Sequence, residues 1–281
     1  MSKLLCVNFR RLFHMKSFYL AITLMMFYPI MSCTSDYAEI LEYGYAHYIE
    51  ESIWSFGTLL SFAMPVLVYL FIGPDYTDKT IRNKLIIGYS KRDVFLANMF
   101  TMMGACFTLF LVWKITFCAI GLPLLYVGNP LYIDILISLE ELAACMLLTS
   151  ILVLLVMFVS GKVSAGILAM VLSLCLIASG VIIKTRLAEE EFIDSEPTWI
   201  EFDGTVHVNG TNAAAPNPKF IPEGPTKEAI RYIERINVGA QLLDVTDNHE
   251  IAPVWYLFFD NVMIGLIVAG GIVLYKRKDI L

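Results

Sequence analysis

The residues best suited to chemistry in this chain are charged side chains at the edges of long apolar runs. Lys114 follows one such run, Glu140 and Glu141 precede another, and Asp260 is the single charged residue inside a third. A lysine and carboxylates at a membrane surface can pair with one another and attract a charged ligand. These four residues could therefore line a charged outer vestibule that contacts cargo, although ordinary snorkelling to the interface is the alternative.

The sequence contains none of the motifs that mark common enzyme classes. It has no GxxxxGK[ST] phosphate loop, no GxSxG nucleophile turn and no HExxH zinc motif. Its histidines are scattered singly and its cysteines form no CxxC pair. Neighbouring carboxylates on a helix point about 100° apart, so a solvated face explains Glu140 and Glu141 better than an acid–base pair. We therefore expect no catalytic residue, no metal site and no cofactor on this chain.

Composition places the chain among membrane proteins. Of its 281 residues, 58% are hydrophobic and 16% are charged, whereas soluble proteins average about 25% charged residues. A bilayer core about 30 Å thick needs about 20 apolar helical residues. Six runs of about that length occur, at 17–35, 52–74, 94–113, 142–161, 163–183 and 251–275. The sequence thus predicts an all-α membrane protein with six transmembrane helices, with membrane lipid and no nucleic acid among its partners.

Basic residues predict the orientation of these helices, because short loops rich in Lys and Arg stay in the cytoplasm. They gather in 1–16, 74–93, 162 and 276–278. The alternate loops, 36–51 and 115–141, contain none. Both termini are therefore expected in the cytoplasm, with Trp54, Trp113 and Trp255 as an aromatic belt at the outer surface.

The same helix geometry predicts where the four charged residues lie. At 1.5 Å per residue, Lys114 is about 32 Å from Asp93, which is close to the thickness of the bilayer core. Similar arithmetic places Glu141 and Asp260 near the same outer surface. All of the vestibule candidates are thus expected at the same depth, near the outer membrane surface.

Three parts of the chain follow from this topology. Residues 1–183 hold the first five helices, an N-terminal segment and the loop 74–93; residues 184–252 form an extracellular insert; and residues 253–281 hold the sixth helix and a basic tail. The insert has thirteen acidic and six basic side chains. Its first half is rich in Pro, Gly and Asn, which predicts turns and short extended pieces, and its second half predicts a helix with Thr226 as its N-cap.

The N-terminal segment has an amphipathic pattern that allows two interpretations. Its apolar residues can lie along the inner membrane surface, or the segment can simply extend the first span into the cytoplasm. These apolar residues are Leu4, Leu5, Phe9, Leu12 and Phe13.

The loop 74–93 carries specific local signals. Ser90 and Asp93 have the spacing of a capping box, which predicts that the third span begins at Ser90. Before it, Ile81, Leu85 and Tyr89 recur every four residues, while Arg82, Asn83 and Lys84 face elsewhere, which predicts a short amphipathic helix that ends near Gly88. Such a helix under a membrane can bind lipid or serve as the contact for a soluble partner.

This loop resembles that of a known family. The segment DYTDKTIRNKLIIGYSKRDVFLANMF is similar to the cytoplasmic loop of ABC-2 type transporter permeases, the membrane subunits of bacterial ATP-binding-cassette exporters. The segments NPKFIPEGPTKEAIRYIERINVGAQLLD and LYKRKDIL are similar to the family's sequence before the last span and to its lysine-rich tail. Lys79 stands where the family usually has glycine. The matching loop positions are Asp75, Thr80, Ile81, Arg82, Asn83, Lys84, Leu85, Gly88 and Ser90.

The resemblance implies a function. The loop helix is expected to seat in a separate ABC ATPase subunit that carries the ATP and Mg²⁺, and the chain is expected to pair with a second copy or a homologous permease in the plasma membrane of a bacterium. The cargo implied is a peptide or drug. The alternative from another class is a membrane sensor or scaffold whose acidic ectodomain binds a peptide or protein partner without transport.

Overall fold

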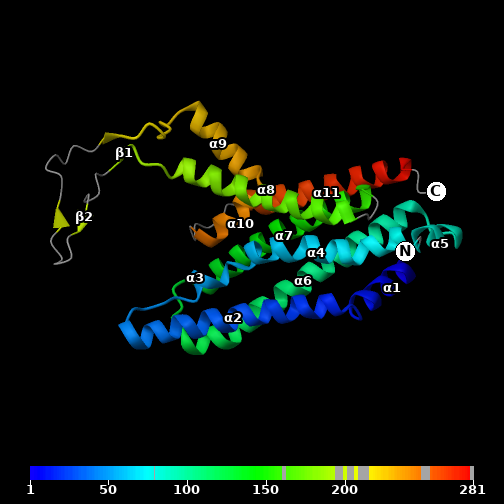
Figure 1. The fold of residues 1–281 in the computed structure, drawn as a ribbon, viewed down its shortest axis with the longest axis horizontal. Helices are drawn as coiled ribbons and strands as arrows, with labels where there is room; N and C mark the ends of the chain where they lie inside the picture. The colour runs from blue at the N-terminus through cyan, green and yellow to red at the C-terminus, as the bar shows by residue number, and fades with distance from the viewer. Residues whose placement is uncertain are drawn as a thin grey trace.

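The fold is a bundle of long helices. The structure is a computed structural model, and it describes residues 1–78, 80–159, 163–193, 199–200, 206–207, 215–247 and 254–278. Six of its helices are long and apolar enough to cross a bilayer, as the sequence predicts. They are α2 (Lys16–Tyr43), α4 (Phe56–Thr77), α6 (Lys91–Leu124), α7 (Leu131–Val159), α8 (Val163–Leu187) and α11 (Val254–Arg277). Figure 1 shows these helices packed lengthwise, with both chain ends at the same end of the bundle.

Shorter helices lie beside and between these long ones. They are α1 (Ser2–Leu12), α3 (Glu50–Ile53), α5 (Thr80–Ile86), α9 (Pro225–Ile236) and α10 (Val238–Asp247). Two antiparallel pairs of short strands follow α8: β1 (Phe192–Ile193) with β4 (Ala215–Pro216), and β2 (Trp199–Ile200) with β3 (Val206–His207). In Figure 1 the strands lie at the end of the bundle opposite α5 and the termini.

Several helices continue beyond the predicted spans. The expected loop 115–141 is mostly helical, because α6 continues to Leu124 and α7 already begins at Leu131. Similarly, α2 runs to Tyr43, where Gly44 ends it in the left-handed conformation at φ 73°. A helix satisfies its own backbone hydrogen bonds, so it can pass charged residues wherever those residues find partners. A prediction that ends each span at its first charged residue therefore makes these helices too short.

Two of the three tryptophans predicted for an aromatic belt lie instead inside the bundle. Trp54 is 1% exposed and Trp113 is fully buried. The indole nitrogen of Trp113 donates a hydrogen bond to the carbonyl of Ile53 at 2.9 Å, which satisfies its one polar atom. Only Trp255, at 75% exposure, has the accessibility that an interfacial belt requires.

The N-terminal helix α1 packs against the first half of α6. Leu4 is buried there, and the Asn8 side-chain nitrogen donates to the Asn98 side-chain oxygen at 2.8 Å. Further along, the ring of Phe9 lies against Gly104, where a Cβ would come within 2.6 Å of it. These contacts advance along both helices, so α1 lies alongside the first half of α6.

The start of α6 agrees with its sequence signals. The Ser90 hydroxyl accepts a hydrogen bond from the Asp93 backbone nitrogen at 3.1 Å and lies 2.8 Å from the Asp93 carboxylate. Gly88, at φ 104°, makes the turn after α5. The capping box and the short helix before it are therefore confirmed.

The helical half of 184–252 departs from its prediction in two ways. It forms two helices, of which α9 begins with Gly224 as N-cap and Pro225 as first residue, so Thr226 is not the cap. The second helix, α10, packs into the bundle against α8 and α7. A Cβ on Gly239 would lie 2.0 Å from the Leu176 carbonyl oxygen, so only glycine allows this approach. Part of the expected insert thus belongs to the bundle.

Candidate functional site

One candidate site is the junction of α1, α4 and α5, which centres on Asp75. This carboxylate is 1% exposed at the end of α4. One of its oxygens binds the Arg11 guanidinium from α1, and the other lies 2.8 Å from the Lys84 ammonium of α5. Arg11 also donates to the Phe71 carbonyl and lies 4.1 Å above the centre of the Phe71 ring. A single buried acid therefore ties three helices together.

The apolar face of α5 completes this attachment. Ile81 is 1% exposed in a small cluster with Leu4 of α1 and residues of α6, and Leu85 and Tyr89 pack against the same cluster. Thr80, at the start of α5, is half-buried. The sequence-predicted face of α5 is thus the one that docks onto the bundle.

The opposite face of α5 is open. Ile86 and Ile87 are 74% and 76% exposed, and Arg82 and Asn83 are exposed beside them. Lys84 was expected to face away with Arg82 and Asn83, but it turns back to Asp75 and donates to the second oxygen of that buried carboxylate. Lys79 lies outside the described residues.

A polar cluster links this junction to α7 and α11. The Tyr76 hydroxyl donates to the Met157 carbonyl at 2.8 Å and lies 2.9 Å from the Tyr275 hydroxyl. The Lys278 ammonium donates to the Met157 and Phe158 carbonyls at 2.7 and 2.6 Å, at the carboxyl end of α7. Partial burial lowers the pKa of Lys278 to about 8, so this ammonium is still mainly charged at neutral pH. Movement of α4 can thus reach α7 and α11 through direct hydrogen bonds.

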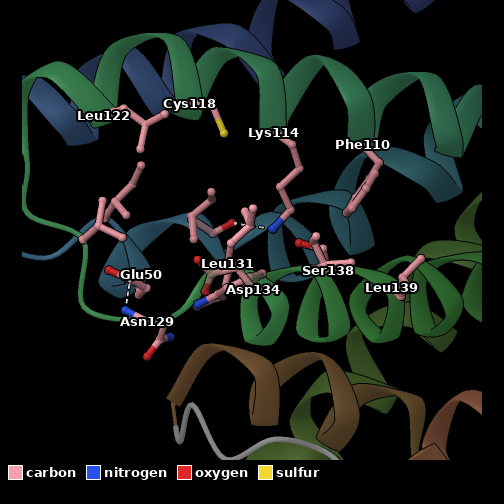
Figure 2. Close-up of a pocket in the computed structure, with 15 residues that line it drawn as sticks. Glu50, Phe110, Lys114, Cys118, Leu122, Asn129, Leu131, Asp134, Ser138 and Leu139 are labelled. Carbon is pink, nitrogen blue, oxygen red and sulfur yellow. Dashed lines mark hydrogen bonds between the residues drawn. The ribbon is translucent and has the colours of Figure 1, made fainter.

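A second candidate site is a pocket at the other end of the bundle. It has a volume of about 410 Å³ and lies between α3, α6 and α7. Figure 2 shows Lys114 reaching from α6 into this pocket, with Phe110 and Leu122 on the same helix and Leu139 on α7. The lining is mostly apolar, with few polar groups, as is usual for sites that take organic ligands.

Lys114 has a specific partner at this pocket. Its ammonium lies 2.8 Å from a Glu141 carboxylate oxygen and 3.9 Å from the centre of the Trp54 ring. The second Glu141 oxygen accepts from the backbone nitrogen of Gly57, in the first turn of α4, at 3.2 Å. The positive end of the α4 dipole and the lysine thus both stabilise this carboxylate.

The other two predicted vestibule residues are also buried. Asp260 of α11 is fully buried, and it accepts a hydrogen bond from the Gln241 side chain of α10 at 3.1 Å. Glu140 and Glu141 are 3% and 1% exposed, so the expected solvated face for this pair is wrong. Glu140 and Glu141, which were expected in the loop 115–141, lie on α7, and Asp260, which was expected inside the sixth span, contacts α10.

Glu50 is a residue of the pocket lining that the sequence did not point to. It is 3% exposed, and one carboxylate oxygen accepts from the backbone nitrogens of Gly128 and Asn129 at 2.8 and 2.7 Å. Figure 2 shows this contact at the edge of the pocket. No local pattern marks Glu50, because its partners are backbone groups far away in the sequence.

Comparison with protein-family models and with curated proteins finds no match for this chain. The class that the fold itself supports is a helical bundle with six candidate membrane spans among the described residues, which is consistent with a multi-pass membrane protein. Any more specific function must be argued from the two candidate sites.

Proposed function

We propose that this chain is the permease subunit of an ATP-driven ABC exporter in a bacterial plasma membrane. It works with a separate ATPase and with a second permease, either another copy or a homologue. In this proposal both termini and α5 face the cytoplasm, and the strands that follow α8 face outward. The distribution of basic residues and the resemblance of the loop sequence support this orientation.

The observation that carries the proposal is the attachment of α5. One face of this short helix is fixed to α1, α4 and α6 through Asp75 and Ile81, and the other presents Arg82, Ile86 and Ile87 to solvent. An exposed apolar pair beside a cation is a surface that suits a protein partner. Because one face of α5 is fixed to the bundle and the other is exposed, this helix can transmit force from such a partner to the bundle.

The contacts around α5 give a route for such force. An ATPase that binds α5 would move α4 through Asp75, and α4 would move α7 and α11 through Tyr76 and its partners. Because packed helices move as rigid bodies, differential binding of the partner would shift the bundle between two arrangements. ATP and Mg²⁺ stay on the partner in this scheme.

The pocket at Lys114 is the proposed outer vestibule. Lys114 lines this pocket and pairs with Glu141, which is buried, as Glu140 and Asp260 are. The apolar walls fit an organic cargo such as a peptide or drug better than a small ion.

The double substitution Arg82→Glu with Ile86→Asp is expected to abolish co-purification of an ATPase with this chain. Both side chains are exposed, so the bundle should keep its stability, whereas Leu85 belongs to the docked face and is left intact. The measurement is affinity purification from membranes of the native host, with identification of bound subunits that carry a phosphate loop.

Arg186→Glu is the matched control, since it makes the same charge reversal on an exposed residue at the other end of the bundle. It should retain the ATPase. If the unaltered chain binds no ATPase, the exporter proposal fails, and a sensor or scaffold without transport becomes the better explanation.

A further inference from the structure

Helices α9 and α10 form an elbow that enters the bundle. They meet at Asn237, and Figure 1 shows them as a V whose tip points toward the end that carries the termini. The Asn237 amide nitrogen donates to the Ser179 hydroxyl at 2.7 Å, and its oxygen accepts from the Gly239 backbone nitrogen at 2.8 Å. The tip of the elbow is thus held beside α8.

The position along α8 gives the depth of this tip. Ser179 lies sixteen residues after Val163, the first residue of α8, which is about 24 Å at 1.5 Å per residue. The hydrocarbon core of a bilayer is about 30 Å thick. If α8 crosses the bilayer from Val163, the tip lies below the far boundary of the hydrocarbon, at the level of the second leaflet.

The apolar face of α9 lacks a protein cover. None of the twelve residues of this helix is buried, and Tyr232, Ile233 and Ile236 are 62%, 55% and 55% exposed. The charged residues of α9 are spread along its length: Lys227, Glu228, Arg231, Glu234 and Arg235. The Glu223 carboxylate, just before the helix, lies 3.0 Å from the Lys227 ammonium and 2.9 Å from the Arg231 guanidinium. The last turn of the helix therefore carries the exposed Ile233 and Ile236 together with Glu234 and Arg235.

This face continues onto a candidate membrane span. A groove of about 660 Å³ separates α9 from the start of α11, with Tyr232, Arg235 and Ile236 on one side. On the other side lie Trp255 and Phe258, which are 75% and 64% exposed. Exposed aromatic residues at the end of a spanning helix face the lipid interface. The same lipid would therefore contact both walls of the groove.

We propose that α9 is an interfacial helix that lies in the bilayer leaflet at this end of the bundle. Its apolar face is immersed in acyl chains, the groove beside α11 holds lipid, and Arg235 faces the phosphate of a headgroup. The first half of α10 is buried and anchors the elbow through Gln241 and Asp260. Lipid accounts for the depth of the elbow tip, for the exposed aromatic residues beside it and for the continuity of the α9 face with α11. A soluble partner would have to enter the leaflet to reach this face.

Spin labels on the full-length chain in phosphatidylcholine–phosphatidylglycerol vesicles test this proposal. Cys6, Cys118 and Cys175 are exposed and would first be replaced by serine. Nitroxides at Ile233→Cys and Ile236→Cys are expected to collide several-fold more with oxygen, which concentrates in lipid, than with a water-soluble nickel chelate. Arg231→Cys, two residues before Ile233 and on the opposite face, is expected to show the reverse preference.

Two outcomes would overturn the proposal. High nickel accessibility at position 233, equal to that at 231, would place the face in water. Low accessibility to both reagents would show that protein covers it, such as a second copy of the chain. Tyr232→Cys reports on the same exposed face if either isoleucine variant fails to fold. The test needs no ATPase, so its result is independent of the proposed exporter function.

Discussion

Replacing Glu141 with glutamine is expected to lower the free energy of unfolding by about 3–5 kcal/mol, because the substitution leaves a buried ammonium without its counter-ion. The Lys114 side chain is 13% exposed and the Glu141 side chain 1%, so little water can compensate for the lost carboxylate. Unfolding by titration with a denaturing detergent measures the loss in micelles.

A double variant separates this ion pair from simple misfolding. Lys114→Met combined with Glu141→Gln removes both charges and should be clearly more stable than Glu141→Gln alone, since neither ion is left uncompensated. If the two losses instead add, the contact between Lys114 and Glu141 contributes nothing of its own. Transport that is unchanged in Lys114→Ala would contradict the role of this pair in an outer vestibule.

The second large effect is expected at Asp75. Asp75→Asn removes the one charge that holds both Arg11 and Lys84, so the loss of stability should again be about 3–5 kcal/mol. Detachment of α5 should also expose the backbone after Arg82 and Lys84 to trypsin. Limited proteolysis of the purified chain in detergent, followed by mass spectrometry, measures the rate of that cleavage.

Asp78→Asn is the matched control, because Asp78 is an exposed acid three residues after Asp75, at the C-cap of the same helix. It should change neither stability nor cleavage appreciably, since exposed ion pairs contribute little. Equal cleavage of the Asp75 and Asp78 variants would mean that Asp75 does not hold α5 in place.

The elements that the sequence predicted well are those with local causes. The six spans follow from runs of about 20 apolar residues, and the start of α6 follows from the hydroxyl of Ser90 and its hydrogen bond with Asp93. Likewise, the four-residue spacing of Ile81 and Leu85 predicted the docked face of α5. Each of these features depends on neighbours within a few turns of chain.

The features that the sequence did not predict depend on contacts between distant segments. Glu141 is buried because Lys114 and the start of α4 meet it from other helices, and Glu50 because a distant loop turns back onto it. The elbow at Asn237 needs the glycine-mediated approach of α10 to α8. The periodicity of apolar residues within one segment cannot reveal such distant partners. Charged residues such as Glu141 were therefore expected to be exposed.

The central claim is that α5 is the contact for an ATPase, and photo-crosslinking in native membranes tests it most directly. A photoreactive amino acid at Ile87, which is 76% exposed, is expected to capture a subunit with a phosphate loop. The same group at Leu122, which is exposed at the opposite end of the bundle, should capture none. Absence of any ATPase crosslink from position 87, with the chain folded and present in the membrane, would contradict the account.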